Sequence, residues 1–229
     1  MMFFYDSYYW ILVLPALLIA IGAQVWVKST FSKYSRMSLQ SGMTGVAACT
    51  AIQQQHGIQV PIQPVGGNLS DHYDPRQNVI RLSESVYGVS SAAAVGVAAH
   101  ETGHALQYAQ GYTPMRLRGA ILPVTRVASG AAPWLFLAGL ILGWGGLAYL
   151  GLAFFAGAMV FQLLTLPVEF NASRRAMAAL REGGMLTEQE LAGARKVLTA
   201  AALTYVAALL VSLMSFLRML LILQGRRRR

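Results

Sequence analysis

The chain has 229 residues, of which 55% are hydrophobic and only 12% are charged. Soluble domains usually contain about 25% charged residues, so this composition favours a membrane protein and excludes a disordered one. The formal net charge is +9, but no nucleic-acid motif accompanies it, and we interpret the charge as a topology signal and as contact with phospholipid. The single cysteine, Cys49, excludes a disulfide framework and a zinc site built from cysteines.

Three long runs without a charged residue predict where the chain crosses lipid. Residues 7–27 and 197–217 each form a run of 21 residues, and residues 127–168 form a run of 42. A membrane-spanning helix needs about 20 apolar residues, so the outer runs fit one span each and the middle run fits two. The segment Gly143–Gly146 would form the hairpin between those two. We therefore expect four spans, at about residues 7–27, 127–144, 147–166 and 198–217.

The first run is expected to be a retained anchor rather than a signal peptide. The residues before it include Asp6 and contain no Lys or Arg, and the apolar run is longer than the apolar core of a signal peptide.

Lys and Arg are distributed unevenly between the runs, which predicts the orientation. Residues 28–126 contain eight and residues 167–196 contain five, whereas the N-terminal tail and the hairpin near 145 contain none. The positive-inside rule therefore predicts a multi-pass protein of the cell membrane with both polar segments in the cytoplasm. Arg218 and the tail 226–229 conflict with this orientation if the last run crosses completely, so whether the last helix spans the membrane stays open.

The polar segment 28–126 is long enough for a small domain at the membrane face. We expect one helix over 38–55, ended by Gly57, and a second over 92–110, capped by Ser90 or Ser91 and ended by Gly111. Short alternating patterns predict strands at 58–60 and 78–82. The expected fold is a mainly α membrane protein with about four transmembrane helices and a small α+β domain at the membrane face.

The helix predicted over 92–110 contains His100, Glu101 and His104 in the pattern HExxH. Residues four apart lie on one helix face, so both imidazoles can reach one metal ion, and imidazole is a favoured zinc ligand. Glu101 is offset around the helix, where it could take a proton from a zinc-activated water. The neighbouring residues are small and apolar, so burying these polar groups is costly unless a metal pairs them. Gly103 would allow another element to pack closely behind the ligands.

A catalytic zinc site needs a third protein ligand from elsewhere in the chain. His56 and His72 are the remaining histidines; we expect His56 to be a helix-end residue without a chemical role. Glu169 is the favoured candidate, because it follows the long uncharged run and a carboxylate at the edge of the bilayer usually has a function. The alternative is an interfacial charge paired with Arg174 or Arg175.

Three segments, HETGHALQ at 100–107, DPRQNVIRLS at 74–83 and PVEFNASRRA at 167–176, resemble the bacterial membrane zinc metallopeptidases of the YugP-like type. The resemblance extends over essentially the whole chain, including the four-span layout. The chain also has a broader, weaker resemblance to the gluzincin membrane proteases, such as the heat-shock membrane metalloprotease and the CAAX prenyl protease. The resemblance implies that the small domain is a zincin-like metalloprotease domain, and that one Zn²⁺ is held by His100, His104 and Glu169, with Glu101 as the general base.

One position departs from the heat-shock proteases, which commonly carry an aspartate four residues after the glutamate ligand. Here that position is Ser173. The hydrogen bonds that orient the ligands would then come from Asn171, Ser173 or Arg174.

We thus predict an integral-membrane zinc endopeptidase that hydrolyses peptide or protein substrates, including membrane proteins. The donor for the oxyanion would be His72, Tyr73 or Arg174. Residues 78–83 would form either an exposed edge strand that pairs with substrate or an ordinary core strand.

Two other classes of function are weighed against the protease. One is a proteolytically inactive, zinc-bound membrane scaffold or assembly factor. The other is a transporter or channel, which is disfavoured because the cores of the expected spans contain no Asp, Glu, His, Lys or Arg. No regulatory partner or oligomeric state is predicted.

The predicted organisation has five parts. They are an anchor over 1–27, a metalloprotease domain over 28–126, a transmembrane hairpin over 127–166, a segment with the third zinc ligand over 167–197, and a C-terminal transmembrane helix with a basic tail over 198–229.

Overall fold

The computed structural model describes residues 6–227, so the outermost residues of the expected anchor and of the basic tail lie outside the described part. The chain divides into two compact units. We call them the membrane unit, formed by Met1–Gln24, Leu117–Leu166 and Thr204–Arg229, and the sheet unit, formed by Val25–Arg116 and Pro167–Leu203.

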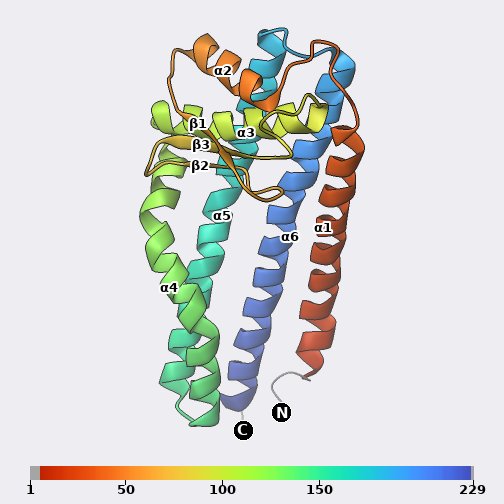
Figure 1. The fold of residues 1–229 in the computed structure, drawn as a ribbon. Coiled ribbons are helices and arrows are strands. Elements are labelled where there is room, and N and C mark those ends of the chain that lie inside the picture. Colours follow the sequence, from red (N-terminus) through yellow and green to blue (C-terminus); the bar gives the residue numbers. More distant parts are fainter. Residues whose placement is uncertain (1–5, 228–229) are drawn as a thin grey trace. The chain divides into compact units, whose positions relative to one another are not determined.

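Helices dominate the structure (Figure 1). A π-helical turn at Tyr9–Val13 leads into the first of the six α-helices found in residues 6–227. The elements are α1 (Leu14–Ser35), α2 (Gly45–His56), β1 (Ile62–Val65), β2 (His72–Asp74), β3 (Val79–Ser83), α3 (Ala92–Ala109), α4 (Thr113–Ile141), α5 (Gly145–Glu182) and α6 (Glu188–Arg227).

Helix α3 forms the centre of the sheet unit. The predicted cap is confirmed, since the Ser91 side chain accepts a hydrogen bond from the backbone N–H of Ala94. The helix begins with small residues, and nearly all of its side chains are buried. A helix that is apolar around its whole circumference must pack on several sides. Accordingly, α3 contributes to one hydrophobic cluster with α2, α5 and α6 and to another with the sheet.

The three strands form one sheet in the order β1-β3-β2, with β3 parallel to β1 and antiparallel to β2. Ile80 and Leu82 of β3 are completely buried. The hypothesis of an exposed edge strand at 78–83 is therefore wrong, and the alternative of a core strand is correct. The alternating pattern could not decide this, because it does not reveal whether a strand has one neighbour or two.

Two predicted boundaries in this unit are also wrong. The helix predicted from residue 38 begins at Gly45 behind the Thr44 cap, because the preceding residues pair instead, with Ser38 bridging to Ser91. The strand predicted at 58–60 is not formed. The Gln53 amide bonds both the N–H and the carbonyl of Val60, which takes the place of a neighbouring strand.

The membrane unit contains a close contact between α4 and α5. An added Cβ on Gly139 would lie 2.3 Å from the backbone nitrogen of Ala148, and one on Gly151 would lie 2.5 Å from that of Phe136. The predicted hairpin between the two helices is confirmed, and Gly143 turns the chain with a φ of 68°. The small residues of this region thus serve close helix packing.

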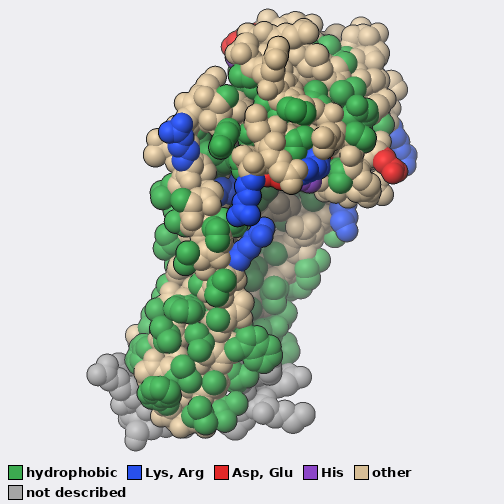
Figure 2. Space-filling model, turned by 60° about the vertical axis from the view of Figure 1, so that its left-hand side comes forward, with side chains coloured by type: hydrophobic (Ala, Val, Ile, Leu, Met, Phe, Trp, Pro, Cys, Tyr) green, Lys and Arg blue, Asp and Glu red, His purple; other side chains and the backbone are tan. Residues whose placement is uncertain are grey.

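In the described part of the chain, four helices are long and apolar enough to cross a membrane: Tyr9–Ser35, Thr113–Ile141, Gly145–Glu182 and the part of α6 up to Gly225. Large apolar side chains such as Val127 and Ile141 of α4 are more than 70% exposed, as expected for a surface that faces lipid. Figure 2 shows hydrophobic side chains over much of the visible face of the long helices. The protein is a mainly α membrane protein with a small α+β part, as predicted.

In the membrane unit, an ion pair joins the start of the first helical segment to the last helix, α6. The Arg218 guanidinium on α6 contacts the Asp6 carboxylate at 2.6 Å and lies over the ring of Tyr9. Both charges flank uncharged runs, Asp6 before the first and Arg218 after the last. Pairing them removes the cost of an isolated charge beside apolar helices.

Candidate metal centre

His100, His104 and Glu169 converge in the sheet unit, the first two from α3 and the third from α5. The Nε2 atoms of His100 and His104 lie 3.3 and 3.6 Å from Oε2 of Glu169. One nitrogen or oxygen atom from each residue lies within 4.8 Å of the others. The two rings stand nearly perpendicular, at 80°, with Nε2 of each facing the carboxylate.

The backbones of α3 and α5 approach closely beside these residues because Gly103 has no side chain. A Cβ at this position would lie 2.6 Å from the carbonyl oxygen of Ala172, too close without a backbone shift. The close approach predicted from Gly103 is thus confirmed, and its partner is the turn of α5 that follows Glu169.

The ring orientation of His104 is set by Gln107, one turn further along α3. The Gln107 Nε2 donates hydrogen bonds to the Val168 carbonyl at 2.8 Å and to Oδ1 of Asn171 at 2.9 Å. A backbone carbonyl can only accept, so the other end of the amide is the oxygen that faces Nδ1 of His104, at 3.0 Å. Nδ1 must then carry a proton, so in the neutral imidazole the lone pair is on Nε2, which faces Glu169.

Arg175 anchors this chain of hydrogen bonds at its far end. Its Nε donates to Oδ1 of Asn171 at 2.7 Å, its terminal nitrogen donates to Oε1 of Gln110, and its guanidinium lies over the ring of Tyr112. Arginine has no acceptor, so the Asn171 atom in this contact must be oxygen. The sequence Arg175, Asn171, Gln107, His104 therefore has one consistent assignment of donors and acceptors.

His100 has a simpler partner. The Ser173 hydroxyl lies 3.1 Å from its Nδ1. A hydroxyl can donate or accept, so this contact holds the ring without dictating which nitrogen carries the proton.

The cluster favours a positive charge at its centre. Burial lowers the pKa of His104, but the hydrogen bond to Glu169 and the nearby charges of Glu101 and Glu169 outweigh burial, and the net pKa is raised. Two imidazole nitrogens and one carboxylate oxygen are also a known donor set of catalytic zinc sites. The residues therefore fit a divalent cation such as zinc by both charge and donor type.

Glu101 is positioned by the edge strand β2. Its Oε2 accepts a hydrogen bond from the Tyr73 backbone N–H at 2.9 Å, and it makes no other hydrogen bond within residues 6–227. The Tyr73 hydroxyl instead donates to Oδ1 of Asn78 at 2.7 Å. Burial, together with Tyr108 and Asp74, raises the pKa of Tyr73 to about 12, so this phenol stays protonated at neutral pH.

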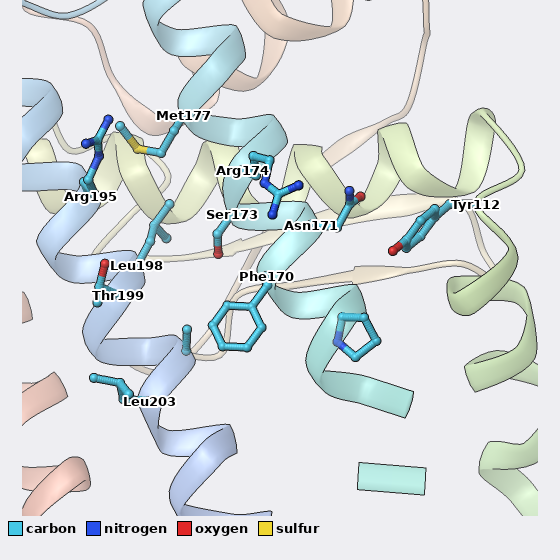
Figure 3. Close-up of a pocket in the computed structure, with 12 residues that line it drawn as sticks. Tyr112, Phe170, Asn171, Ser173, Arg174, Met177, Arg195, Leu198, Thr199 and Leu203 are labelled. Carbon is cyan, nitrogen blue, oxygen red and sulfur yellow. The ribbon is translucent and has the colours of Figure 1, made fainter. Parts of the chain in front are cut away.

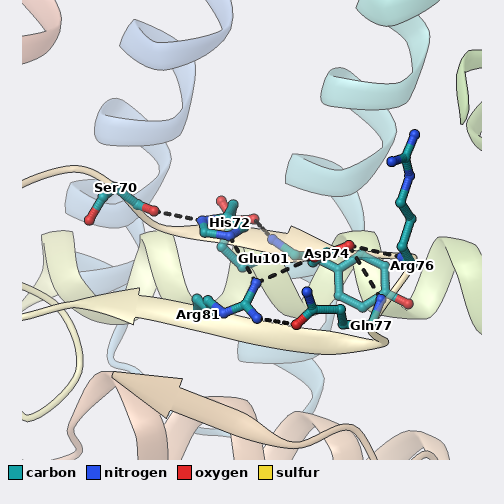
Figure 4. A network of polar contacts seen from close by, with 8 residues as sticks. Ser70, His72, Asp74, Arg76, Gln77, Arg81 and Glu101 are labelled. Atoms are coloured by element: carbon teal, nitrogen blue, oxygen red, sulfur yellow. Dashed lines mark hydrogen bonds and ion pairs between the residues drawn. The ribbon is translucent and has the colours of Figure 1, made fainter. Parts of the chain in front are cut away.

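His72 lies on the exposed side of β2, in a separate polar network (Figure 4). Its Nδ1 lies 2.8 Å from the Ser70 carbonyl, and its Nε2 lies 3.5 Å from a terminal nitrogen of Arg81. Arg81 also contacts Asp74 and Gln77. The third candidate for the oxyanion, Arg174, is exposed and lines a pocket beside α5.

Sequence reasoning missed Gln107 and Arg175 as neighbours of the centre. Gln107 could have been found, because it lies three residues after His104 and so on the same helix face. Arg175 could not, because only the packing of α5 against the end of α3 brings it to Asn171 and Gln110.

The sequence comparisons agree with this arrangement. Residues 9–224 match the model of a family described as "Putative neutral zinc metallopeptidase". The chain belongs to this family. It is also 50% identical over 217 residues to the "Putative membrane protease YugP" of Bacillus subtilis (strain 168), with 94% of this chain and 96% of the relative covered. No solved structure matches the chain. With its four apolar helices, the chain is a membrane member of the zinc metallopeptidase family.

Proposed function

We propose that the protein is an integral-membrane, zinc-dependent endopeptidase whose catalytic centre is the cluster of His100, His104 and Glu169 with Glu101 beside it. The observation that carries the proposal is the convergence of three donor atoms within 4.8 Å, next to a buried carboxylate with a single hydrogen bond. One zinc ion would be held, because the donors face a single point. Bound there, it would supply Lewis acidity for the carbonyl to be cleaved and for water.

Glu101 is the proposed general base. The hydrogen bond from the Tyr73 N–H holds one carboxylate oxygen and leaves the other available. That second oxygen takes the proton of the attacking water and then delivers it to the departing amine, so one group serves both proton transfers of amide hydrolysis. Because Glu101 is only 8% exposed, it meets little bulk water that could compete for this proton.

Gln107 and Ser173 keep the two imidazoles in place during this cycle. The Gln107 amide holds His104 in the tautomer whose Nε2 can act as a ligand, and the Ser173 hydroxyl supports His100. Such outer contacts typically contribute 10- to 100-fold to metal affinity or activity.

The proposed location of the centre is the cytoplasmic side of the cell membrane. The segments 28–126 and 167–196, which contain most of the sheet unit, carry eight and five Lys and Arg residues. The contact between Asp6 and Arg218 supports an even number of crossings, as four full spans would give. Two of those crossings would lie between the polar segments, so both segments would be on the same side of the membrane. Peptide or protein chains, including those of membrane proteins, are the proposed substrates.

The decisive experiment compares Glu101→Gln with Glu84→Gln in the purified full chain. Glu84 is an exposed glutamate of the same unit, so it controls for loss of a carboxylate. We expect Glu101→Gln to keep its zinc, measured by elemental analysis, and to lose cleavage of a quenched fluorescent peptide library by about 10²- to 10⁴-fold. Full activity in the Glu101→Gln protein would refute the role of Glu101.

A wild-type protein that contains zinc but cleaves neither the peptide library nor a membrane-protein substrate would instead support the inactive scaffold. Replacing Glu169 with Ala separates the ligand set from the base, because it should lower zinc content itself. Unchanged zinc content in Glu169→Ala would remove Glu169 from the proposed ligands.

A further inference from the structure

A pocket of about 720 Å³ lies in the sheet unit between α5 and α6, beside the metal centre (Figure 3). None of the three predicted metal ligands lines it. Its wall on α5 includes Pro167, Phe170 and Arg174, which lie three to seven residues apart and so share one helix face. The opposite wall on α6 includes Arg195 and Leu203.

Along both helices the lining changes from apolar to basic, and on α5 Met177 follows Arg174. On α5, Pro167 lies in the long uncharged run and Arg174 lies seven residues beyond it, about 10 Å along the axis. On α6, Leu203 lies in the last uncharged run and Arg195 lies eight residues before it, about 12 Å along the axis. The two helices therefore repeat the same change from apolar to basic lining, and over nearly the same length.

The basic end has no counter-charge. The described residues that line the pocket include no Asp or Glu. Arg174 and Arg195 are both exposed, and neither makes a hydrogen bond or ion pair to another residue within 6–227. At the other end, Phe170 and Leu203 are 43% and 37% exposed. The guanidiniums of Arg174 and Arg195, without a partner among the described residues, thus line the same cavity as exposed apolar side chains.

We propose that this pocket binds an anionic phospholipid, with the phosphate headgroup between Arg174 and Arg195 and the first part of an acyl chain against Phe170 and Leu203. Guanidinium groups suit phosphate because they offer paired N–H donors. The pocket lies where the uncharged runs end, which is the depth at which a lipid changes from headgroup to hydrocarbon. Basic pockets between membrane helices on the cytoplasmic side bind anionic headgroups in this way.

The site has a route to the metal centre. Asn171 and Ser173 line the pocket, and they also bond Gln107 and His100. A lipid bound there would restrict the turn of α5 that carries both residues.

The test uses the full-length protein in detergent micelles, with dioleoyl-phosphatidylglycerol and dioleoyl-phosphatidylcholine as probes and native mass spectrometry as the readout. We expect the wild type to retain phosphatidylglycerol in preference to phosphatidylcholine. The variant Arg174→Gln/Arg195→Gln should lose this preference, by about fivefold for each guanidinium removed. Arg174→Lys/Arg195→Lys should keep part of it.

The matched control is Arg36→Gln/Lys196→Gln, which removes two exposed cations of the same unit that do not line the pocket. Its lipid preference should equal that of the wild type. Equal retention of both lipids by the wild type, or equal loss in the control, would overturn the proposal. So would displacement of the lipid by millimolar glycerol phosphate, which would indicate a site for free phosphate. An effect of the double variant confined to cleavage of acidic peptides would also overturn it, in favour of a peptide subsite.

Discussion

The two units use the same device, a glycine at a helix contact, for different ends. In the sheet unit, Gly103 lets α3 approach the Ala172 backbone of α5. In the membrane unit, Gly139 lets α4 approach the Ala148 backbone of the same helix α5. Polar groups cluster around the first contact, whereas apolar side chains such as Phe136 and Leu152 pack around the second.

The difference follows from what each contact must hold. In lipid there is no hydrophobic force between helices, so close backbone packing supplies much of their attraction. In the sheet unit, burial in water-excluding packing already supplies the stability, and the close approach serves to bring the Glu169 turn up to the two histidines. The glycine contact therefore stabilises helix packing in the membrane unit, whereas in the sheet unit it positions Glu169 beside the two histidines.

The largest effect is expected from Gly103→Ala. The added methyl group meets the backbone of Ala172, which cannot rotate away, so α3 and α5 must separate. We expect the sheet unit to lose about 3 kcal/mol of stability and the protein to lose its zinc. Amide hydrogen exchange by mass spectrometry should show faster exchange in the sheet unit but not in the membrane unit. Gly88→Ala is the control, since no atom lies within 4 Å of the added carbon.

The variant Gln107→Met tests the polar groups that surround the α3–α5 contact of the sheet unit. This change keeps the volume of the side chain but removes the acceptor for Nδ1 of His104, so we expect zinc affinity to fall by 10- to 100-fold in chelator competition. The control is Gln53→Met, which removes a buried glutamine that bonds Val60 in the same unit. Gln53→Met should cost stability without weakening zinc; equal losses of affinity in both variants would contradict a specific role for Gln107.

The same substitution in the other unit, Gly139→Ala, should have the opposite profile. The methyl group would lie within 2.3 Å of the Ala148 nitrogen, and we expect a loss of about 2 kcal/mol as α4 and α5 separate. Hydrogen exchange should increase in the membrane unit, while zinc content stays at the wild-type level. Loss of zinc here would show that the two contacts are not independent.

The smallest effect concerns pH and is confined to the sheet unit. Burial raises the pKa of Cys49 from 9.0 to about 12, so the unfolded thiol ionises first as the pH rises. Stability contributed by the neutral thiol is complete below pH 9 and is lost between pH 9 and pH 12. We expect about 1 kcal/mol to be lost between pH 9 and pH 10, measured by rate-corrected hydrogen exchange. Cys49→Ala should remove this loss.

Much of the arrangement could be predicted because it depends on local pattern. The HExxH spacing places His100 and His104 on one helix face whatever surrounds them. The Ser91 cap could likewise be predicted, from the residue type that precedes the helix. The hydrogen-bond partners of the histidines could not be predicted, except where an i to i+3 spacing applies, as for Gln107. The central position of β3 was also unreadable, since pairing with β1 and β2 joins residues far apart in sequence.

The sequence by itself determined the four apolar helices, the hairpin at Gly143 and the metal-binding pattern on α3, because composition and periodicity act over one or two turns of chain. Only the tertiary structure decided that Glu169 faces both imidazoles, that Arg175 fixes the orientation of Gln107 through Asn171, and that Arg174 and Arg195 line one pocket. Each of these depends on how α5 packs against α3 and α6, and such contacts leave no periodic signal in the sequence.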